Sequence, residues 1–280
     1  MSYKTISIFV QDAERDRFAL SAAFQIARRE EAYLEITCLG IDPMPVDAVV
    51  AGAVPVYMMN GVEEAQENAK TLAEWVKTQI PADLSRVEVQ PVAMLNAGLE
   101  TVVSRYARYA DLLILPQPYE EGRNRVVDSL LAGALFNTDA PVLVIPPADL
   151  DYSAAFSRAL VAWNESDEAL STIRKALPIL QAASHTDVVM VDPPTRSAER
   201  SDPGGALAMM LSRHGVRADV EILAKTLPKV ADILLRYAAD HGNDVLVMGA
   251  YGHSRLRQAV LGGVTRSMLA GLSLPVLMAH

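Results

Sequence analysis

Short apolar runs alternate with longer amphipathic stretches along the chain. The runs at 5–10 and 158–163 are bounded by polar turns, a pattern typical of buried parallel strands. The stretches that follow, 18–29 and 169–180, place apolar residues at helical spacing. Strands that alternate with helices predict an α/β protein with helices on both faces of a parallel sheet.

The same order of elements occurs twice. Second strands, third strands and later helices recur at 33–40 and 187–191, at 87–94 and 218–223, and at 99–109 and 230–241. The clearest pairs are 110–115 with 243–248 and 140–145 with 274–279. We therefore expect two tandem doubly wound domains, each a five-stranded mostly parallel sheet flanked by helices. They would span residues 1–149 and 156–280, because Pro146-Pro147-Ala148-Asp149 breaks both helix and strand.

A glycine-rich segment follows the fourth strand of the second repeat. The apolar run 245–248 stops at Gly249, Gly252 follows, and Gly262 and Gly263 precede the helix-like segment 264–270. Glycines let the backbone approach an anion closely, and free N–H groups at a helix start point at negative charge. Arg255, Arg257 and Arg266 add cations nearby. The alternative is that the glycines only permit a tight turn between strand and helix.

The spacing of this segment resembles the ATP-loop signature of the universal stress protein family. The matching positions are Gly249, Gly252, Gly262, Gly263, Val264 and Thr265. Nucleotide-binding members usually carry Ser or Thr where this chain has Gly263, so one hydroxyl for phosphate is missing while Thr265 keeps another. The resemblance implies ATP or a related adenine nucleotide, with or without Mg²⁺. Met248, His253 and Arg255 complete the expected loop side of the site.

The other side of the expected site lies at the ends of the first two strands of the second repeat. The end of a first strand lies beside that of the fourth in a doubly wound sheet, so Ala162, Trp163 and Asn164 should face the glycine loop. Family members usually have Asp where this chain has Asn164, whose amide oxygen still accepts hydrogen bonds. Met190 and Val191 would line the adenine side if the family geometry holds. Trp163 could pack on the base or belong to the core, and core packing is the simpler interpretation.

The first repeat lacks this chemistry. Where the second has its glycines, the first has Pro116-Gln117-Pro118-Tyr119 followed by Glu120 and Glu121. Prolines remove N–H donors, and the two carboxylates would repel phosphate. We therefore expect a degenerate first site, filled by its own loop or empty.

Charge and composition limit the partners and cellular locations that the sequence allows. The net charge of −9 argues against a nucleic-acid partner. Residues 1–150 hold 12 Lys and Arg against 21 Asp and Glu, whereas residues 151–280 hold 13 Lys and Arg and 13 Asp and Glu. The second half is therefore the better place for an anionic ligand to bind. No stretch is long and apolar enough for a signal peptide or membrane span, which predicts a cytoplasmic protein without a membrane partner. Cys38, the single cysteine, lies in an apolar run and is expected to be buried and inert.

The sequence shows little catalytic chemistry. The five histidines are not spaced as paired ligands, so no structural metal is expected. Because the glycine loop has no lysine, we expect nucleotide binding without efficient turnover, and no catalytic residue. Two alternatives stay open. One is a nucleotide-independent stress scaffold that acts through protein partners, and the other is an ATP-using ligase or phosphohydrolase.

Assembly is predicted from the closing strands. The runs 142–145 and 276–279 resemble the edge strands through which family members dimerise. In a tandem chain the two copies can cover each other, which gives an intrachain pseudo-dimer. The pattern leaves open whether two chains form a homodimer. It also leaves open whether segment 49–59 is a lid, a partner surface or part of the core.

Overall fold

The computed structural model describes residues 3–42, 55–95, 98–119, 125–193, 202–250 and 263–280; within these, the side chains of residues 55–60 and 95 are not described. Segment 49–59, whose role the sequence leaves open, lies mostly outside these ranges. Its last five residues belong to the backbone of a helix.

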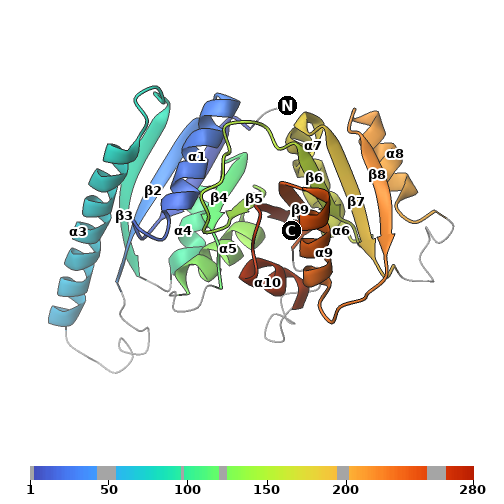
Figure 1. Ribbon diagram of the computed structural model, residues 1–280. Coiled ribbons are helices and arrows are strands. Elements are labelled where there is room, and N and C mark those ends of the chain that lie inside the picture. The colour runs from blue at the N-terminus through green and yellow to red at the C-terminus, as the bar shows by residue number, and fades with distance from the viewer. Residues whose placement is uncertain (1–2, 43–54, 96–97, 120–124, 194–201, 251–262) are drawn as a thin grey trace.

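Ten strands form one continuous sheet in the order β3-β2-β1-β4-β5-β10-β9-β6-β7-β8 (Figure 1). The strands of the first half are β1 (Thr5–Val10), β2 (Tyr33–Asp42), β3 (Val87–Leu95), β4 (Leu112–Pro116) and β5 (Val142–Ile145). Those of the second half are β6 (Arg158–Ala162), β7 (His185–Val191), β8 (Ala218–Leu223), β9 (Val245–Gly249) and β10 (Val276–Ala279). The pairing is parallel within each half. The predicted fold class is confirmed.

The two halves meet through β5 and β10, which pair antiparallel with Leu143 opposite Leu277. Both strands are fully buried. Their residues, Val-Leu-Val-Ile and Val-Leu-Met-Ala, are apolar throughout, as expected of strands covered on both faces. The pairing turns two five-stranded sheets into one and leaves β3 and β8 as the outer strands.

Helices cover both faces of the sheet (Figure 1). One buried cluster joins the sheet to α1, α3, α6, α7 and α8, and a second joins it to α4, α5, α9 and α10. Their bounds are α1 (Arg17–Glu30), α3 (Pro55–Gln79), α4 (Leu99–Tyr106), α5 (Val126–Asn137), α6 (Asp167–Lys175), α7 (Leu177–Ala182), α8 (Gly205–Arg213), α9 (Val230–His241) and α10 (Gly263–Ala270). Successive residues of each buried strand alternate between the two clusters because side chains of a strand point to opposite faces.

One local feature differs from the sequence-based expectations and two agree with them. The stretch 169–180, expected to be one helix, is divided between α6 and α7, because Pro178 has no N–H to continue the helical ladder. Helix α9 ends at His241 as expected, with Gly242 in the left-handed conformation (φ 67°) that favours glycine. Cys38 is buried, and burial raises the pKa of its thiol to about 12, so it is inert at neutral pH as predicted.

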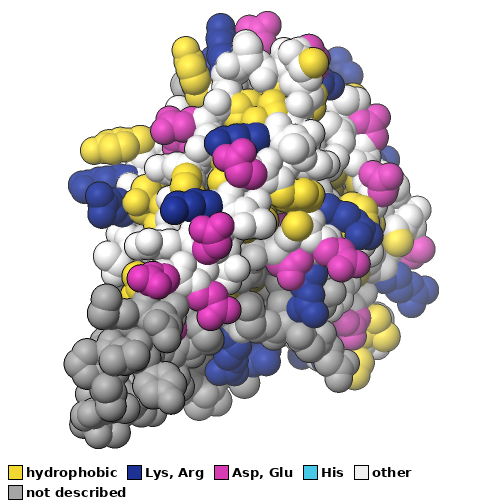
Figure 2. Space-filling model, turned by 90° about the vertical axis from the view of Figure 1, so that its left-hand side faces the viewer, with side chains coloured by type: hydrophobic (Ala, Val, Ile, Leu, Met, Phe, Trp, Pro, Cys, Tyr) yellow, Lys and Arg dark blue, Asp and Glu magenta, His cyan; other side chains and the backbone are white. Residues whose placement is uncertain are grey.

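The molecular face at the α3 and β3 end carries Lys and Arg side chains interspersed with Asp and Glu (Figure 2). Such mixing gives that face no broad field of one sign. Among the described residues, none of the helices has the length and apolar character that crossing a bilayer requires.

Candidate functional site

The second half contains a topological switch point between β6 and β9. These strands are paired neighbours, with Ala162 opposite Met248. The helix after β6, α6, packs in one hydrophobic cluster, whereas the helix after β9, α10, packs in the cluster on the other face. The chain therefore leaves two adjacent strands toward opposite faces, and in doubly wound sheets such a point is where a ligand crevice forms at the carboxyl ends of the strands. Ligands of doubly wound sheets bind at this place.

Seven of the predicted site residues lie along this edge of the sheet. Ala162 is opposite Met248 on one side and Val189 on the other, so Met190 and Val191 end β7 at the same edge. The side chains divide between the two faces. Ala162, Val191 and Met248 belong to the α9 and α10 face, and Trp163 and Met190 to the α6 and α8 face. Asn164 and Gly249 follow at the edge itself.

Trp163 is a core residue. Its side chain is 8% exposed and belongs to the cluster beneath α6. The backbone N–H of Trp163 donates to Val189 O at 2.9 Å, which extends the pairing with β7 past the end of β6. The indole Nε1, however, is buried without a hydrogen-bond partner among the described residues. A buried N–H is costly to leave unpaired, so an ordered water is the simplest partner for this donor.

Asn164 has a structural role in the turn that starts α6. Its Oδ1 accepts a hydrogen bond from Ser166 N at 3.3 Å, and Ser166 Oγ in turn accepts from Ala169 N at 3.2 Å as the helix cap. Between them, Glu165 has a positive φ of 61°, a strained conformation for a residue with a side chain. Glu165 Oε1 is also buried without a partner among the described residues. Neither Glu165 nor Ser166 is among the site residues predicted from the sequence, although a Ser followed by Asp and Glu is a helix-start signal.

Gly249 is required for the approach of α6 to β9. A Cβ at this position would lie 2.6 Å from Ala169 N and 2.9 Å from Ala169 Cα. Both atoms are backbone and cannot move aside independently, so only glycine fits. After it, the N–H of Ala250 donates to Ala279 O at 2.9 Å. The first glycine of the segment thus holds the first turn of α6 against the strand that ends at the crevice.

The middle of the glycine segment, with Gly252, His253, Arg255 and Gly262, lies outside the described residues. The described part resumes at α10, where Gly263 and Val264 are exposed and Thr265 is buried. A Cβ on Gly263 would meet no atom of the described residues within 4 Å. The first N–H groups of α10 carry the positive end of the helix dipole.

The corresponding edge of the first half is filled by its own residues. Asp16 is fully buried, and its Oδ2 accepts from the backbone N–H of Gln11 at 2.9 Å and of Asp12 at 3.1 Å. After β4, Gln117 Nε2 donates to Ala270 O at 3.3 Å, and the Tyr119 ring lies 5.1 Å from the guanidinium of Arg266. The Asp16 carboxylate thus accepts from the backbone at the end of β1, and the residues after β4 contact the second half. Arg266, one of the cations that the sequence places near the glycine segment, lies over Tyr119 of the first half.

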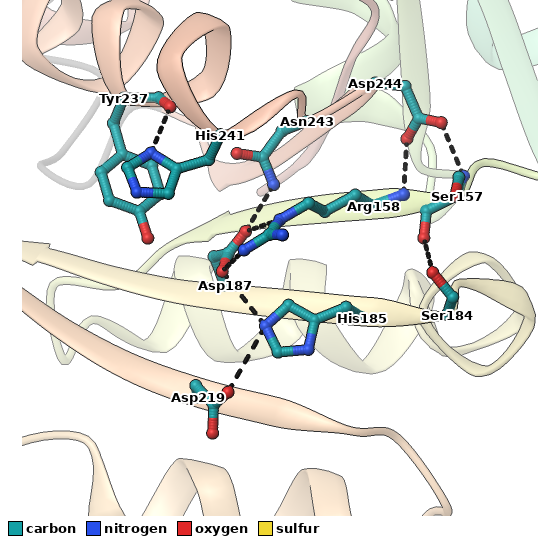
Figure 3. Close-up of polar contacts among 10 residues, drawn as sticks. All are labelled: Ser157, Arg158, Ser184, His185, Asp187, Asp219, Tyr237, His241, Asn243 and Asp244. Carbon is teal, nitrogen blue, oxygen red and sulfur yellow. Dashed lines mark hydrogen bonds and ion pairs between the residues drawn. The ribbon is translucent and has the colours of Figure 1, made fainter.

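The opposite edge of the second half holds a polar cluster that the sequence analysis did not identify (Figure 3). Asp187 on β7 is buried and accepts hydrogen bonds from Arg158 and from Asn243 Nδ2, the latter at 2.7 Å. His185 Nε2 lies 3.2 Å from Asp187 Oδ1. Burial alone raises the pKa of Asp187, but the hydrogen bonds from Arg158 and Asn243 outweigh it, so the net pKa is lowered. The carboxylate is therefore ionised and structural.

Within the ranges that the structure describes, no group of three or more His, Cys, Asp or Glu side chains is arranged to hold a metal ion.

Tyr237 stacks on His241 near the Asp187 cluster, and burial raises the pKa of the Tyr237 phenol to about 12. The phenol is therefore protonated at neutral pH.

The ten-stranded, mostly parallel sheet with helices on both faces and the switch point between β6 and β9 define a doubly wound α/β protein. Residues 155–280 match the model of the Universal stress protein family. Universal stress protein Slr1230 from Synechocystis sp. is 37% identical over 73 residues, which are 26% of this chain and 24% of that protein. The chain thus spans about a quarter of the length of the curated relative that it matches.

The arrangement of both halves is found in solved structures. A universal stress protein from Archaeoglobus fulgidus superposes with a TM-score of 0.68 at 13% identity, covering 98% of this chain and 95% of that one. A second structure, from Pseudomonas aeruginosa, gives a TM-score of 0.59 at 16% identity and covers 99% and 93% of the two chains. At these identities the likeness establishes the fold of the whole chain. Residues 155–280 form a domain of the universal stress protein family.

Proposed function

We propose that this chain is a stress-response protein whose second half binds ATP or a related adenine nucleotide without efficient turnover. The observation that carries the proposal is the switch point between β6 and β9, from which the glycine-rich segment leaves. A ligand in that crevice would lie between Trp163 and Asn164 on one side and the start of α10 on the other.

The described residues fit a nucleotide in two respects. A phosphate suits the N–H groups and the dipole at the start of α10, where no atom of the described residues lies within 4 Å of a Cβ on Gly263. The unpartnered Trp163 Nε1–H supplies a buried donor at the same edge. Among the remaining proposed contacts, Gly252, Gly262, Val264 and Thr265 follow from the family's signature, and His253 and Arg255 are proposed because they lie in the same segment. Slow turnover follows from the absence of a lysine in the segment.

We also infer the domain division and the assembly. Residues 1–149 would form the degenerate domain and residues 156–280 the binding domain, joined by the β5–β10 pairing as an intrachain pseudo-dimer. The proposal for the first domain rests on Asp16 and on Gln117 and Tyr119, which occupy its own edge. A cytoplasmic location accords with this function.

Calorimetric titration of ATP into the wild type and the Gly252→Val variant tests the proposal. We expect saturable heat from the wild type and a large loss of affinity in the variant, because a valine side chain would obstruct close backbone approach to phosphate. Circular dichroism and thermal unfolding of both proteins check that the variant folds. Absence of heat from the wild type, or equal heats from two folded proteins, would contradict nucleotide binding at this segment.

A nucleotide-independent scaffold is the second candidate. It is favoured by Asn164, whose amide oxygen already accepts a bond within its own turn, and by Arg266, which lies over Tyr119. A wild type that shows no thermal shift with ATP, ADP or AMP, yet retains a stable protein partner in stoichiometric amount, would favour this candidate.

A further inference from the structure

A cleft of about 540 Å³ lies where the two halves meet, away from the crevice described above. Its walls come from both halves. The first half contributes Tyr3 and the turns that precede β4 and β5, and the second contributes the end of α6, α7 and the cap of α8. Because β5 and β10 run antiparallel, the beginning of β5 lies beside the end of β10, and the cleft forms at this junction.

Two contacts fix the walls of the cleft relative to each other. Lys175 Nζ lies 2.7 Å from Asp139 Oδ1, and Tyr3 Oη donates to Lys175 O at 3.0 Å. Each contact joins the first half to α6. Burial raises the pKa of Tyr3, so its phenol remains a donor at neutral pH. Both contacts therefore join the two halves at the wall of the cleft.

The charges in the cleft are unbalanced in favour of cations. Its lining includes Arg108, Arg174 and Lys175 against two carboxylates, Asp111 and Asp139. Both carboxylates are already engaged. Asp111 Oδ2 accepts from the backbone N–H of Lys4 at 2.8 Å and of Thr5 at 2.9 Å, and Asp139 is paired with Lys175. The guanidinium groups of Arg108 and Arg174 have no hydrogen-bond or ion-pair partner among the described residues, and both side chains are exposed. Two guanidinium groups on the cleft lining are therefore available to an anion.

We propose that this cleft binds a small phosphorylated molecule. Guanidinium groups match the geometry of a phosphate, which can accept two parallel N–H bonds from each, and two of them balance a phosphate dianion. The volume is of the size found in small-molecule sites and exceeds what an inorganic anion alone needs. The ring of Tyr109, 83% exposed at the rim, offers an apolar surface for the rest of the ligand.

Because the cleft lies between the two halves, a ligand bound in it would stabilise the whole chain. Arg108 belongs to the first half and Arg174 to the second, so one phosphate held by both would bridge the halves. A ligand that binds only the assembled protein stabilises it in proportion to its occupancy. Binding in the cleft should therefore raise the temperature of unfolding of both halves together.

Calorimetry with inorganic pyrophosphate as the probe tests the site. The variant Arg108→Gln/Arg174→Gln removes both guanidinium groups. Its matched control, Lys70→Gln/Arg236→Gln, removes two exposed positive charges on α3 and α9 and so alters the net charge equally. We expect saturable binding to the wild type and the control, and an affinity at least tenfold weaker in the cleft variant. The unfolding temperature should rise with pyrophosphate in the first two proteins only.

Pyrophosphate could also bind the glycine segment, so the titrations are repeated in the Gly252→Val background. The cleft site should persist there and disappear with the two arginine substitutions. Saturable binding that the cleft variant and its control share equally would overturn the proposal, as would no binding to the wild type. ATP could likewise bind the cleft, so the ATP titration of Gly252→Val is repeated in the Arg108→Gln/Arg174→Gln background, and either site can then fail while the other stands.

Discussion

The Asp187 carboxylate accepts two hydrogen bonds from the Arg158 guanidinium, at 2.7 Å from Nε and 2.8 Å from Nη2 (Figure 3). Arg158 begins β6 and Asp187 lies on the adjacent β7, so the pair ties two central strands together at the amino edge of the second half. Asn243, which precedes β9, adds a third bond to the same carboxylate. This cluster fixes the strands whose other ends form the candidate nucleotide crevice.

Replacing Asp187 by Asn should lower the free energy of unfolding by about 2 kcal/mol at pH 7, because the Arg158 and Asn243 donors lose a charged acceptor. The Arg158 side chain is 35% exposed and partly hydrated, which keeps the loss below that of a fully buried pair. Urea unfolding measures the change. Asp219→Asn is the control, since that carboxylate is 74% exposed and only approaches His185 at 3.5 Å. It should change stability by less than about 0.5 kcal/mol.

The same pair predicts a dependence on acid. The pKa of Asp187 is lowered in the folded protein relative to its ordinary value of 3.8. A group with a lowered folded pKa stabilises the protein fully above its unfolded pKa and loses that contribution as pH falls toward the folded pKa. The stability difference between wild type and Asp187→Asn should therefore be constant near neutrality and shrink below about pH 4. A difference that stays unchanged down to pH 3 would show that the charge of Asp187 does not matter.

Gly249→Ala should destabilise the second half by about 1–3 kcal/mol, the usual effect of overpacking. The new Cβ would lie 2.6 Å from Ala169 N, so either α6 or the end of β9 must shift. Gly263→Ala is a matched control, because its Cβ meets no atom within 4 Å in the part of the chain that the structure describes. Thermal unfolding should show a lower midpoint for the first variant and an unchanged or slightly higher one for the second. Equal midpoints would mean that the close approach at Gly249 has no energetic importance.

Thr172→Val should remove a buried hydrogen bond between α6 and the end of β10. The Thr172 hydroxyl on α6 accepts from the Ala279 N–H at 3.1 Å, and both residues are buried. Valine keeps the side-chain volume but leaves that N–H unpaired, which costs about 1–3 kcal/mol. Amide exchange at Ala279 should accelerate in this variant.

Thr172→Ser provides the comparison. It retains the hydroxyl and loses one methyl group, worth about 1 kcal/mol. The Ala279 amide should keep its protection in Thr172→Ser, and equally fast exchange in both variants would argue against the hydrogen bond.

Gly263→Ser should strengthen nucleotide binding if the proposed site is correct. Serine supplies the hydroxyl that nucleotide-binding members of the family usually have there, and the space around Gly263 admits a side chain. One further hydrogen bond to phosphate is worth about 1–1.5 kcal/mol, or roughly fivefold to tenfold in the dissociation constant for ATP. Gly263→Ala, which adds the Cβ without the hydroxyl, should leave the affinity unchanged. Equal affinities for Gly263→Ser and the wild type would place the phosphates elsewhere.

The sequence by itself determined the elements and their repetition. Strands such as β8 and helices such as α9 have the bounds that their periodicity predicts, because the alternation of apolar residues is a local property. The duplicated order of those elements predicted two parallel doubly wound sheets. The glycine spacing predicted a nucleotide site in the segment after β9. The prolines and carboxylates after β4 predicted that the first half lacks a similar site.

Only the tertiary structure decided which residues meet across the chain. It showed that Gly249 serves the approach of α6, that Arg266 lies over Tyr119, and that Arg108 and Arg174 line one cleft. It also revealed the bond between Thr172 and Ala279, 107 residues apart in the chain. Periodicity specifies which face of an element is buried but not which distant side chain it meets. That choice depends on how the antiparallel junction of β5 and β10 brings the two halves together.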